Sequence, residues 1–99
     1  MKSQLQNCGI PSALVAVDSA IALTCVVNSE VDARQLACPL PLLKAKQGLR
    51  NLSAGELLRV RATDAGSLKD FVSFATLTGQ VIEHFCAQDG CYYFVIRKH

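Results

Sequence analysis

The residues best suited to chemistry lie around one cysteine, in the run Cys38-Pro39-Leu40-Pro41. Proline lacks a backbone N–H and clashes with the preceding turn, so a helix accepts it in its first turn but not in its interior. Pro39 and Pro41 therefore predict a helix that begins directly after Cys38. A thiol at a helix N-terminus faces the positive end of the helix dipole, which is expected to lower its pKa and favour the nucleophilic thiolate. The alternative is a buried structural cysteine, a common environment for this residue.

Size and composition limit the classes of function. The chain has 99 residues, of which 51% are hydrophobic, so it can build one domain around a small core. A net charge of +2 is too small to indicate nucleic-acid binding by itself. Five unevenly spaced cysteines do not form the pattern of a secreted disulfide framework. We therefore expect a protein of the reducing cytoplasm, with no membrane association and no direct binding of nucleic acid.

Residues 1–28 differ from the rest of the chain and are predicted to be an extension of unknown structure in front of a domain at residues 29–99. Lys2 and Asp18 are the only charged residues of this segment. A signal peptide or membrane anchor is disfavoured, because Pro11 and Asp18 interrupt the apolar stretch. Two interpretations stay open: a pair of β-prone segments around Asp18, or a loosely attached extension.

The hydrophobic pattern from residue 28 onwards predicts a β-α-β-α-β-β order. Strands are expected at residues 28–36, 56–63, 80–87 and 91–98, with one helix over residues 39–52 and a second helix between Ser67 and Gly79. Helical crossovers make the first strands parallel, and the last two strands form an antiparallel hairpin. The expected fold class is a two-layer α/β sandwich, with two helices on one face of a four-stranded mixed sheet.

This topology brings a second loop to Cys38. Both helices begin at the carboxyl edge of the sheet, so the loop of residues 63–67 is expected beside the cysteine. Asp64 and Ser67 are the side chains predicted to support the sulfur. Ser67 and Asp70 also have the spacing of a capping box at the start of the second helix.

The motif around Cys38 resembles that of the TusA/SirA/YedF family of small sulfur carriers. The similar pattern is Asp-Ala-Arg-x-Leu-x-Cys-Pro-x-Pro-Leu-Leu-Lys at residues 32–44, followed by Thr-Asp-x-Gly-Ser at 63–67 and Tyr-x-Phe-x-Ile-Arg-Lys at 92–98. Three positions depart from it: Gln35 replaces a usual glycine, Ala65 an often-found proline, and Leu40 the glutamate typical of the proteins of tRNA thiouridine synthesis. The resemblance implies a fold similar to the C-terminal domain of translation initiation factor three.

The resemblance also implies a sulfurtransferase-type function. Cys38 would accept sulfur as a persulfide from a cysteine desulfurase or a rhodanese-like protein, and pass it to an acceptor such as a DsrE-like protein. The pathway would be tRNA thiolation or another branch of sulfur metabolism. No metal or organic cofactor is implied, because the sulfur is carried covalently. Pro39 and Pro41 would hold the sulfur outward. Charge and position predict a partner-docking surface, made of Arg34, Leu40, Lys44, Lys46 and Arg50.

Two alternatives come from other classes of function. His84, Cys86 and Cys91 of the predicted hairpin are soft ligands that could hold zinc, or the two cysteines could form a disulfide. The other alternative is a non-catalytic interaction module that binds RNA or a regulatory partner. It would use the arginines of the uncovered sheet face, which are Arg59, Arg61 and Arg97.

Overall fold

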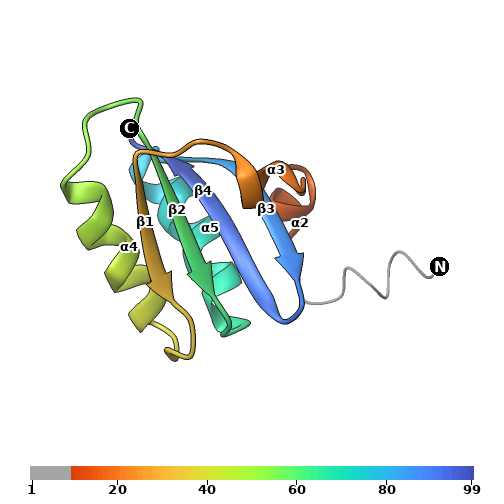
Figure 1. Cartoon of the computed structure of the whole chain (residues 1–99). Helices are drawn as coiled ribbons and strands as arrows, with labels where there is room; N and C mark the ends of the chain where they lie inside the picture. The colour runs from red at the N-terminus through yellow and green to blue at the C-terminus, as the bar shows by residue number, and fades with distance from the viewer. Residues whose placement is uncertain (1–9) are drawn as a thin grey trace.

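The structure is a computed structural model that describes residues 10–99 (Figure 1). Its elements, in chain order, are α2 (Ser12–Val15), α3 (Ile21–Thr24), β1 (Ser29–Ala33), α4 (Leu40–Arg50), β2 (Leu57–Ala62), α5 (Gly66–Thr78), β3 (Val81–Gln88) and β4 (Cys91–Arg97). From β1 onwards this is the predicted order, although α4 begins one residue and ends two residues inside the predicted range.

The four strands form one mixed sheet in the order β1-β2-β4-β3. β1 and β2 are parallel, with Ala33 paired to Ala62 at their carboxyl ends. β4 is antiparallel to both β2 and β3. α4 and α5 cover the same face of the sheet, behind the strands in Figure 1. The predicted two-layer α/β fold is confirmed, and the parallel pair brings the two loops that follow β1 and β2 to one edge.

The core lies between the sheet and these two helices. Leu58, Val60 and Ala62 alternate along β2 and are fully buried, as the period-two pattern predicts. Phe94 of β4 contributes to the same layer, and its ring lies 4.3 Å from that of Phe71 on α5, centroid to centroid. These contacts fix the sheet against the helices and so hold the two loops at the β1–β2 edge in place.

Gly48 allows α4 to pack closely on the sheet. A Cβ atom at this position would lie 3.0 Å from Val31 Cγ2 and 3.1 Å from Leu58 Cδ1. The sequence suggests only a weak point in a helix, since glycine has low helix propensity. The structure supplies the packing reason for its presence.

Gly48→Val is therefore expected to lower the free energy of unfolding by about 2 kcal/mol, because a branched side chain must push apart well-packed neighbours. Urea unfolding measures the change. Gln47→Val is the matched control, since Gln47 is exposed on the same helix and should change by less than about 0.7 kcal/mol. Equal effects of the two changes would contradict the close-packing explanation.

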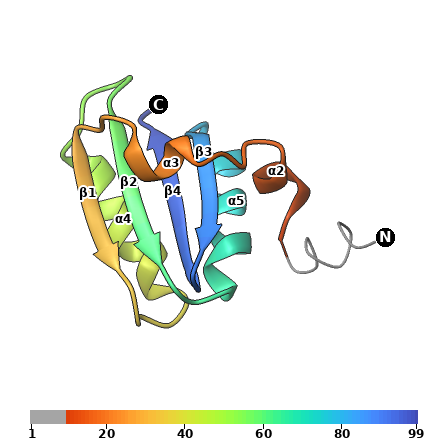
Figure 2. The same cartoon turned by 45° about the vertical axis from the view of Figure 1, so that its right-hand side comes forward.

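Residues 10–28 wrap around the β3 edge of the sheet (Figures 1 and 2). α2 packs against β3 and α5, and its Leu14 is fully buried in the main core. The chain then pairs with the edge strand, where Ser19 N–H donates to Phe85 O at 2.7 Å and Phe85 N–H donates to Val17 O at 3.1 Å. α3 crosses the sheet face opposite α4 and α5, which we call the outer face.

Neither of the two interpretations that the sequence left open fits residues 10–28, and residues 1–9 of the predicted extension lie outside the described residues. The segment is attached to the domain, and it forms two four-residue helices around a single β-bridge at Asp18 instead of two strands. Within residues 10–99, no helix is long and apolar enough to cross a membrane.

Candidate functional site

Cys38 lies exposed in the loop between β1 and α4. α4 begins at Leu40, with Pro39 at the N-cap and Pro41 buried in the first turn. The proline pair thus predicts the helix start to within one residue. Cys38 itself precedes the cap, and its backbone N–H donates to Asp64 Oδ2 at 2.5 Å.

Two carboxylates face Cys38. Asp64 accepts a hydrogen bond from the backbone N–H of Cys38, and Asp70 Oδ2 accepts one from the Cys38 Sγ–H at 2.5 Å. The hydrogen bond to Asp70, with partial desolvation and the negative charges of Asp70 and Asp64, raises the pKa of the Cys38 thiol above its ordinary value. The predicted lowering of this pKa by the helix dipole is therefore wrong, because nearby carboxylates outweigh it. The Cys38 Sγ–H therefore faces a carboxylate instead of a free helix N-terminus.

Gly66 and Ser67 shape the second loop. A Cβ atom on Gly66 would lie 3.2 Å from Cys38 Cβ and 3.7 Å from Cys38 Sγ, so the missing side chain leaves room for the cysteine. Ser67 is fully buried, and its hydroxyl donates to Asp64 O at 2.6 Å. Ser67 therefore orders the Asp64 turn rather than contacting the sulfur.

The predicted capping box of Ser67 and Asp70 is wrong. α5 begins at Gly66 with Ala65 at its N-cap, and the Gly66 N–H donates to Asp64 Oδ1 at 3.4 Å. Asp70 lies one turn inside the helix and binds the Cys38 thiol instead. Asp70 is the site residue that the sequence reasoning missed, although its spacing of four residues from Gly66 places both on one face of α5.

The two loops are joined by a second hydrogen bond, from Gln35 N–H to Thr63 Oγ1 at 2.8 Å. Gln35 has a φ of 67°, in the left-handed region that favours glycine. This conformation gives the physical reason why glycine suits the position that Gln35 occupies here. The loop geometry is nevertheless kept, since two hydrogen bonds fix it to the 63–64 segment.

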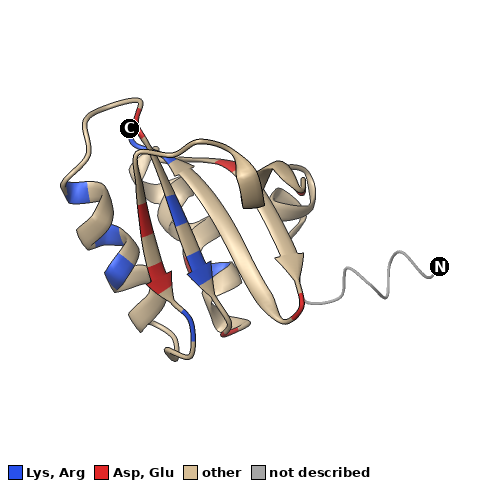
Figure 3. Ribbon diagram, in the orientation of Figure 1, with Lys and Arg blue, Asp and Glu red and all other residues tan. Residues whose placement is uncertain are grey.

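The predicted docking residues lie on α4 and beside it. Lys44, Lys46 and Arg50 are exposed, and Figure 3 shows α4 carrying basic residues without acidic ones. Leu40, at the start of the helix, is 45% exposed. Arg34 differs from the others because its guanidinium binds Asp32 at 2.8 and 2.9 Å, which holds the pKa of that carboxyl well below its usual range.

Two cavities adjoin this surface. One, of about 480 Å³, is lined by Arg34, Lys44 and Thr63 among others. The second, of about 240 Å³, lies between α4 and α5, where Lys46 and Asp70 line it together with Leu42 and Phe74. Asp70 therefore links the thiol to the groove between the helices.

The hairpin does not assemble the metal site considered from the sequence. Cys86 pairs with Tyr93, whereas Cys91 pairs with Gln88, so the three soft ligands do not converge. Across residues 10–99 no group of three or more metal-binding side chains is present. Cys86 and Cys91 are both free thiols, so the disulfide alternative is also wrong.

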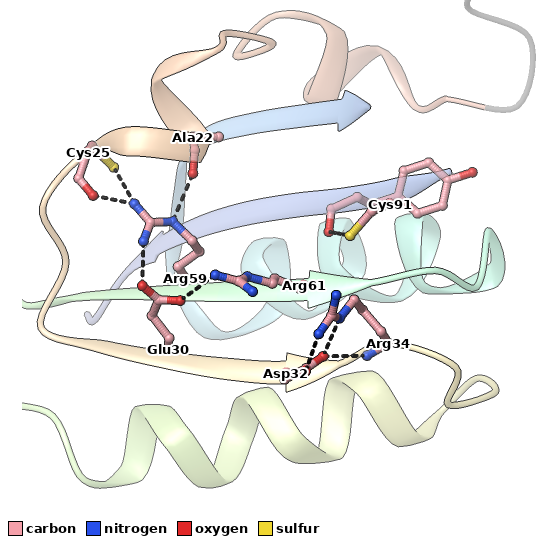
Figure 4. A network of polar contacts seen from close by, with 9 residues as sticks. Ala22, Cys25, Glu30, Asp32, Arg34, Arg59, Arg61 and Cys91 are labelled. Carbon is pink, nitrogen blue, oxygen red and sulfur yellow. Dashed lines mark hydrogen bonds and ion pairs between the residues drawn. The ribbon is translucent and has the colours of Figure 1, made fainter. Parts of the chain in front are cut away.

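All three arginines of the outer face bind other groups of the protein, and Figure 4 shows the contacts of Arg59 and Arg61. Arg59 is 6% exposed and donates to the carbonyls of Ala22 and Cys25 and to Glu30. The other two also have carboxylate partners: Arg61 binds Glu30 at 3.1 Å and Arg97 binds Glu83 at 2.5 Å. The RNA-binding or regulatory alternative would therefore have to use arginines that are already ion-paired within the protein.

Comparison with known proteins finds a sulfurtransferase family model and several sulfur carrier proteins. The family model described as Sulfurtransferase TusA matches residues 29–98. A sulfur carrier protein TusA of Allochromatium vinosum is 45% identical over 71 residues, covering 72% of this chain and 93% of that protein. A putative sulfur carrier protein of Neisseria meningitidis is 42% identical over 72 residues, which are 72% of this chain and 97% of the relative.

A solved structure is also similar. The crystal structure of a SirA-like protein from Desulfitobacterium hafniense superposes with a TM-score of 0.63 at 25% identity, covering 70% of this chain and 95% of that one. These relatives are covered almost completely, and the family model begins at residue 29. Residues 10–28 therefore lie outside the family match.

Proposed function

Because the chain belongs to the sulfurtransferase TusA family, with its family match spanning residues 29–98, we propose that it relays sulfur as a persulfide on Cys38. The observation that carries the proposal is the exposed Cys38 thiol, held between two hydrogen-bonded loops with a carboxylate at its proton. Exposure allows another protein's sulfur to reach Cys38, and the two loops fix where the thiol points.

The proposed reaction is an exchange between sulfur atoms. Cys38 Sγ attacks the outer sulfur of a donor persulfide, so that a new S–S bond forms on Cys38 while the S–S bond of the donor breaks. The donor is left as a thiol and Cys38 as a persulfide. One S–S bond replaces another, so there is no net oxidation or reduction. Delivery repeats the exchange, with an acceptor cysteine attacking the outer sulfur on Cys38.

The proposed donor is a cysteine desulfurase or a rhodanese-like protein of the cytoplasm, and the proposed acceptor is another protein cysteine, as on a DsrE-like protein. The basic, partly apolar surface of α4 supports docking of acidic partners close to Cys38. Leu40, which lies two residues after the thiol, gives this surface an apolar contact. The sequence departs here from the glutamate of tRNA-thiolation proteins, so tRNA thiolation is one of several pathways that fit.

The test is to incubate the purified protein with a cysteine desulfurase and cysteine, and then to measure the intact mass. We expect a gain of one sulfur atom, and proteolytic mapping after alkylation should place it on the peptide that contains Cys38. Reduction should remove the added mass, since a persulfide is a sulfur–sulfur bond. No gain with a competent desulfurase or a rhodanese, or a gain that maps to another cysteine, would overturn the proposal.

A further inference from the structure

The Cys38 thiol contacts Asp70, which lies outside the Cys38 loop and the loop of residues 63–67. Asp70 is half-buried on α5, whereas Cys38 lies in the loop before α4, so packing of the two elements brings them together. The Cys38 Sγ–H donates to Asp70 Oδ2 at 2.5 Å, while Asp64 is occupied by the Cys38 backbone N–H. Asp70 is therefore the carboxylate in contact with the reacting sulfur.

The exchange reaction requires a proton to leave and to return at this sulfur. When Cys38 accepts sulfur from a donor R–S–SH, the products are Cys38–S–SH and R–SH, and the Cys38 proton must move to the departing donor sulfur. When the sulfur is passed on, the Cys38 sulfur leaves and must regain a proton. A carboxylate within hydrogen-bond distance of the reacting atom has the geometry of a general acid–base group.

We propose that Asp70 is a catalytic residue that holds this proton: its carboxylate accepts the Cys38 thiol proton as the new S–S bond forms, and its carboxyl returns a proton to Cys38 as sulfur is delivered. This proposal rests on the proposed persulfide relay. In the first half-reaction the proton continues from Asp70 to the thiolate of the donor, and in the second it comes from the attacking acceptor thiol. Each full transfer therefore leaves Asp70 as it began.

Asp70 lies beside a second carboxylate and a cavity with a basic residue in its lining. Asp64 is the second carboxylate that faces the thiol, from the loop before α5. Lys46 of α4 lines the same cavity as Asp70, and this cavity of about 240 Å³ opens between the helices. A donor or acceptor bound over this cavity would therefore lie beside Asp70.

A proton-transfer role of Asp70 and a purely electrostatic role predict opposite effects of Asp70→Asn on the rate of sulfur transfer. The negative charge of Asp70 raises the pKa of the Cys38 thiol, so removing it increases the thiolate fraction at neutral pH. If Asp70 only repelled the thiolate, Asp70→Asn would react faster than the native protein. If Asp70 handles the proton, Asp70→Asn slows sulfur transfer even though more thiolate is present.

The experiment measures two rates in the full chain for the native protein, Asp70→Asn and Asp89→Asn. The first is the alkylation of Cys38 by iodoacetamide as a function of pH, which reports the thiol pKa. The second is sulfur uptake at neutral pH from a cysteine desulfurase with cysteine, followed by intact mass. Asp89→Asn is the matched control, because Asp89 is exposed in the β3–β4 turn, and circular dichroism checks that both variants fold.

For Asp70→Asn we expect the alkylation profile to move to lower pH while sulfur uptake falls by about 10²-fold, the usual size of a general acid–base contribution. Asp89→Asn should match the native protein in both rates. Uptake by Asp70→Asn that is unchanged or faster would overturn the role of Asp70 and leave the relay intact. Absence of uptake by the native protein would overturn the relay itself, and this proposal with it.

Discussion

Cys38→Ser is expected to accept no sulfur from a cysteine desulfurase, whereas Cys86→Ser should accept it at the native rate. Serine keeps the size of the side chain and a polar O–H, but its oxygen cannot form a persulfide, so the loss should be complete rather than partial. The variant should remain folded, because Cys38 is exposed and none of the core depends on its side chain. Intact mass after incubation with desulfurase and cysteine measures the effect.

Cys86 is the suitable control because its environment differs in a defined way. Its side chain is partly buried on β3, and burial together with the nearby charge of Asp18 raises the pKa of its thiol. It lies outside the loops that hold Cys38. If Cys38→Ser still gained sulfur, or if Cys86→Ser lost it, the nucleophile of the relay would have to be placed elsewhere.

The position of this nucleophile could be predicted from local sequence, whereas its proton environment could not. Pro39 and Pro41 limit where a helix can begin, which is a property of the chain itself. The parallel order of β1 and β2 then predicts that Asp64 lies near Cys38, because the ends of adjacent parallel strands meet. The sign of the pKa shift depends on Asp70, whose approach to the thiol requires the packing of α5 against the loop before α4.

Asp70 was missed because a local pattern offered another explanation for it. A serine followed by an acidic residue three positions later matches a capping box, and nothing in the sequence shows that α5 already begins at Gly66. A shift of the N-cap by two residues, from Ser67 to Ala65, turns a predicted capping side chain into one that faces a different loop. Helix boundaries are uncertain by such amounts in sequence reasoning.

On the outer face, too, the sequence predicts the strand pattern but not the tertiary contacts of the arginines. The alternation of β2 correctly places Arg59 and Arg61 opposite the core residues, but it predicts an uncovered face with free arginines. In the structure, residues 10–28 cover part of that face, and the carbonyls of Ala22 and Cys25 accept hydrogen bonds from Arg59 (Figure 4). Two helices of four residues have too little periodicity to be read from sequence, since tertiary packing stabilises them.

Leu14→Ala should lower the free energy of unfolding by about 3 kcal/mol, the usual cost of truncating a buried leucine. Leu14 is fully buried in the main core although it lies outside the residues matched by the family model. For a domain of this size the loss corresponds to a fall in Tm of about 12–24 °C. Thermal and urea unfolding of the full chain measure both quantities.

Val26→Ala is the matched control, because Val26 lies in the same N-terminal segment but is 90% exposed. Its truncation should change the free energy of unfolding by less than about 0.5 kcal/mol. Small and equal effects of both changes would mean that residues 10–28 do not pack against the domain. A large effect of Leu14→Ala alone would make this segment an integral part of the core, so that truncating the chain to the family match would remove a stabilising contact along with the N-terminal addition.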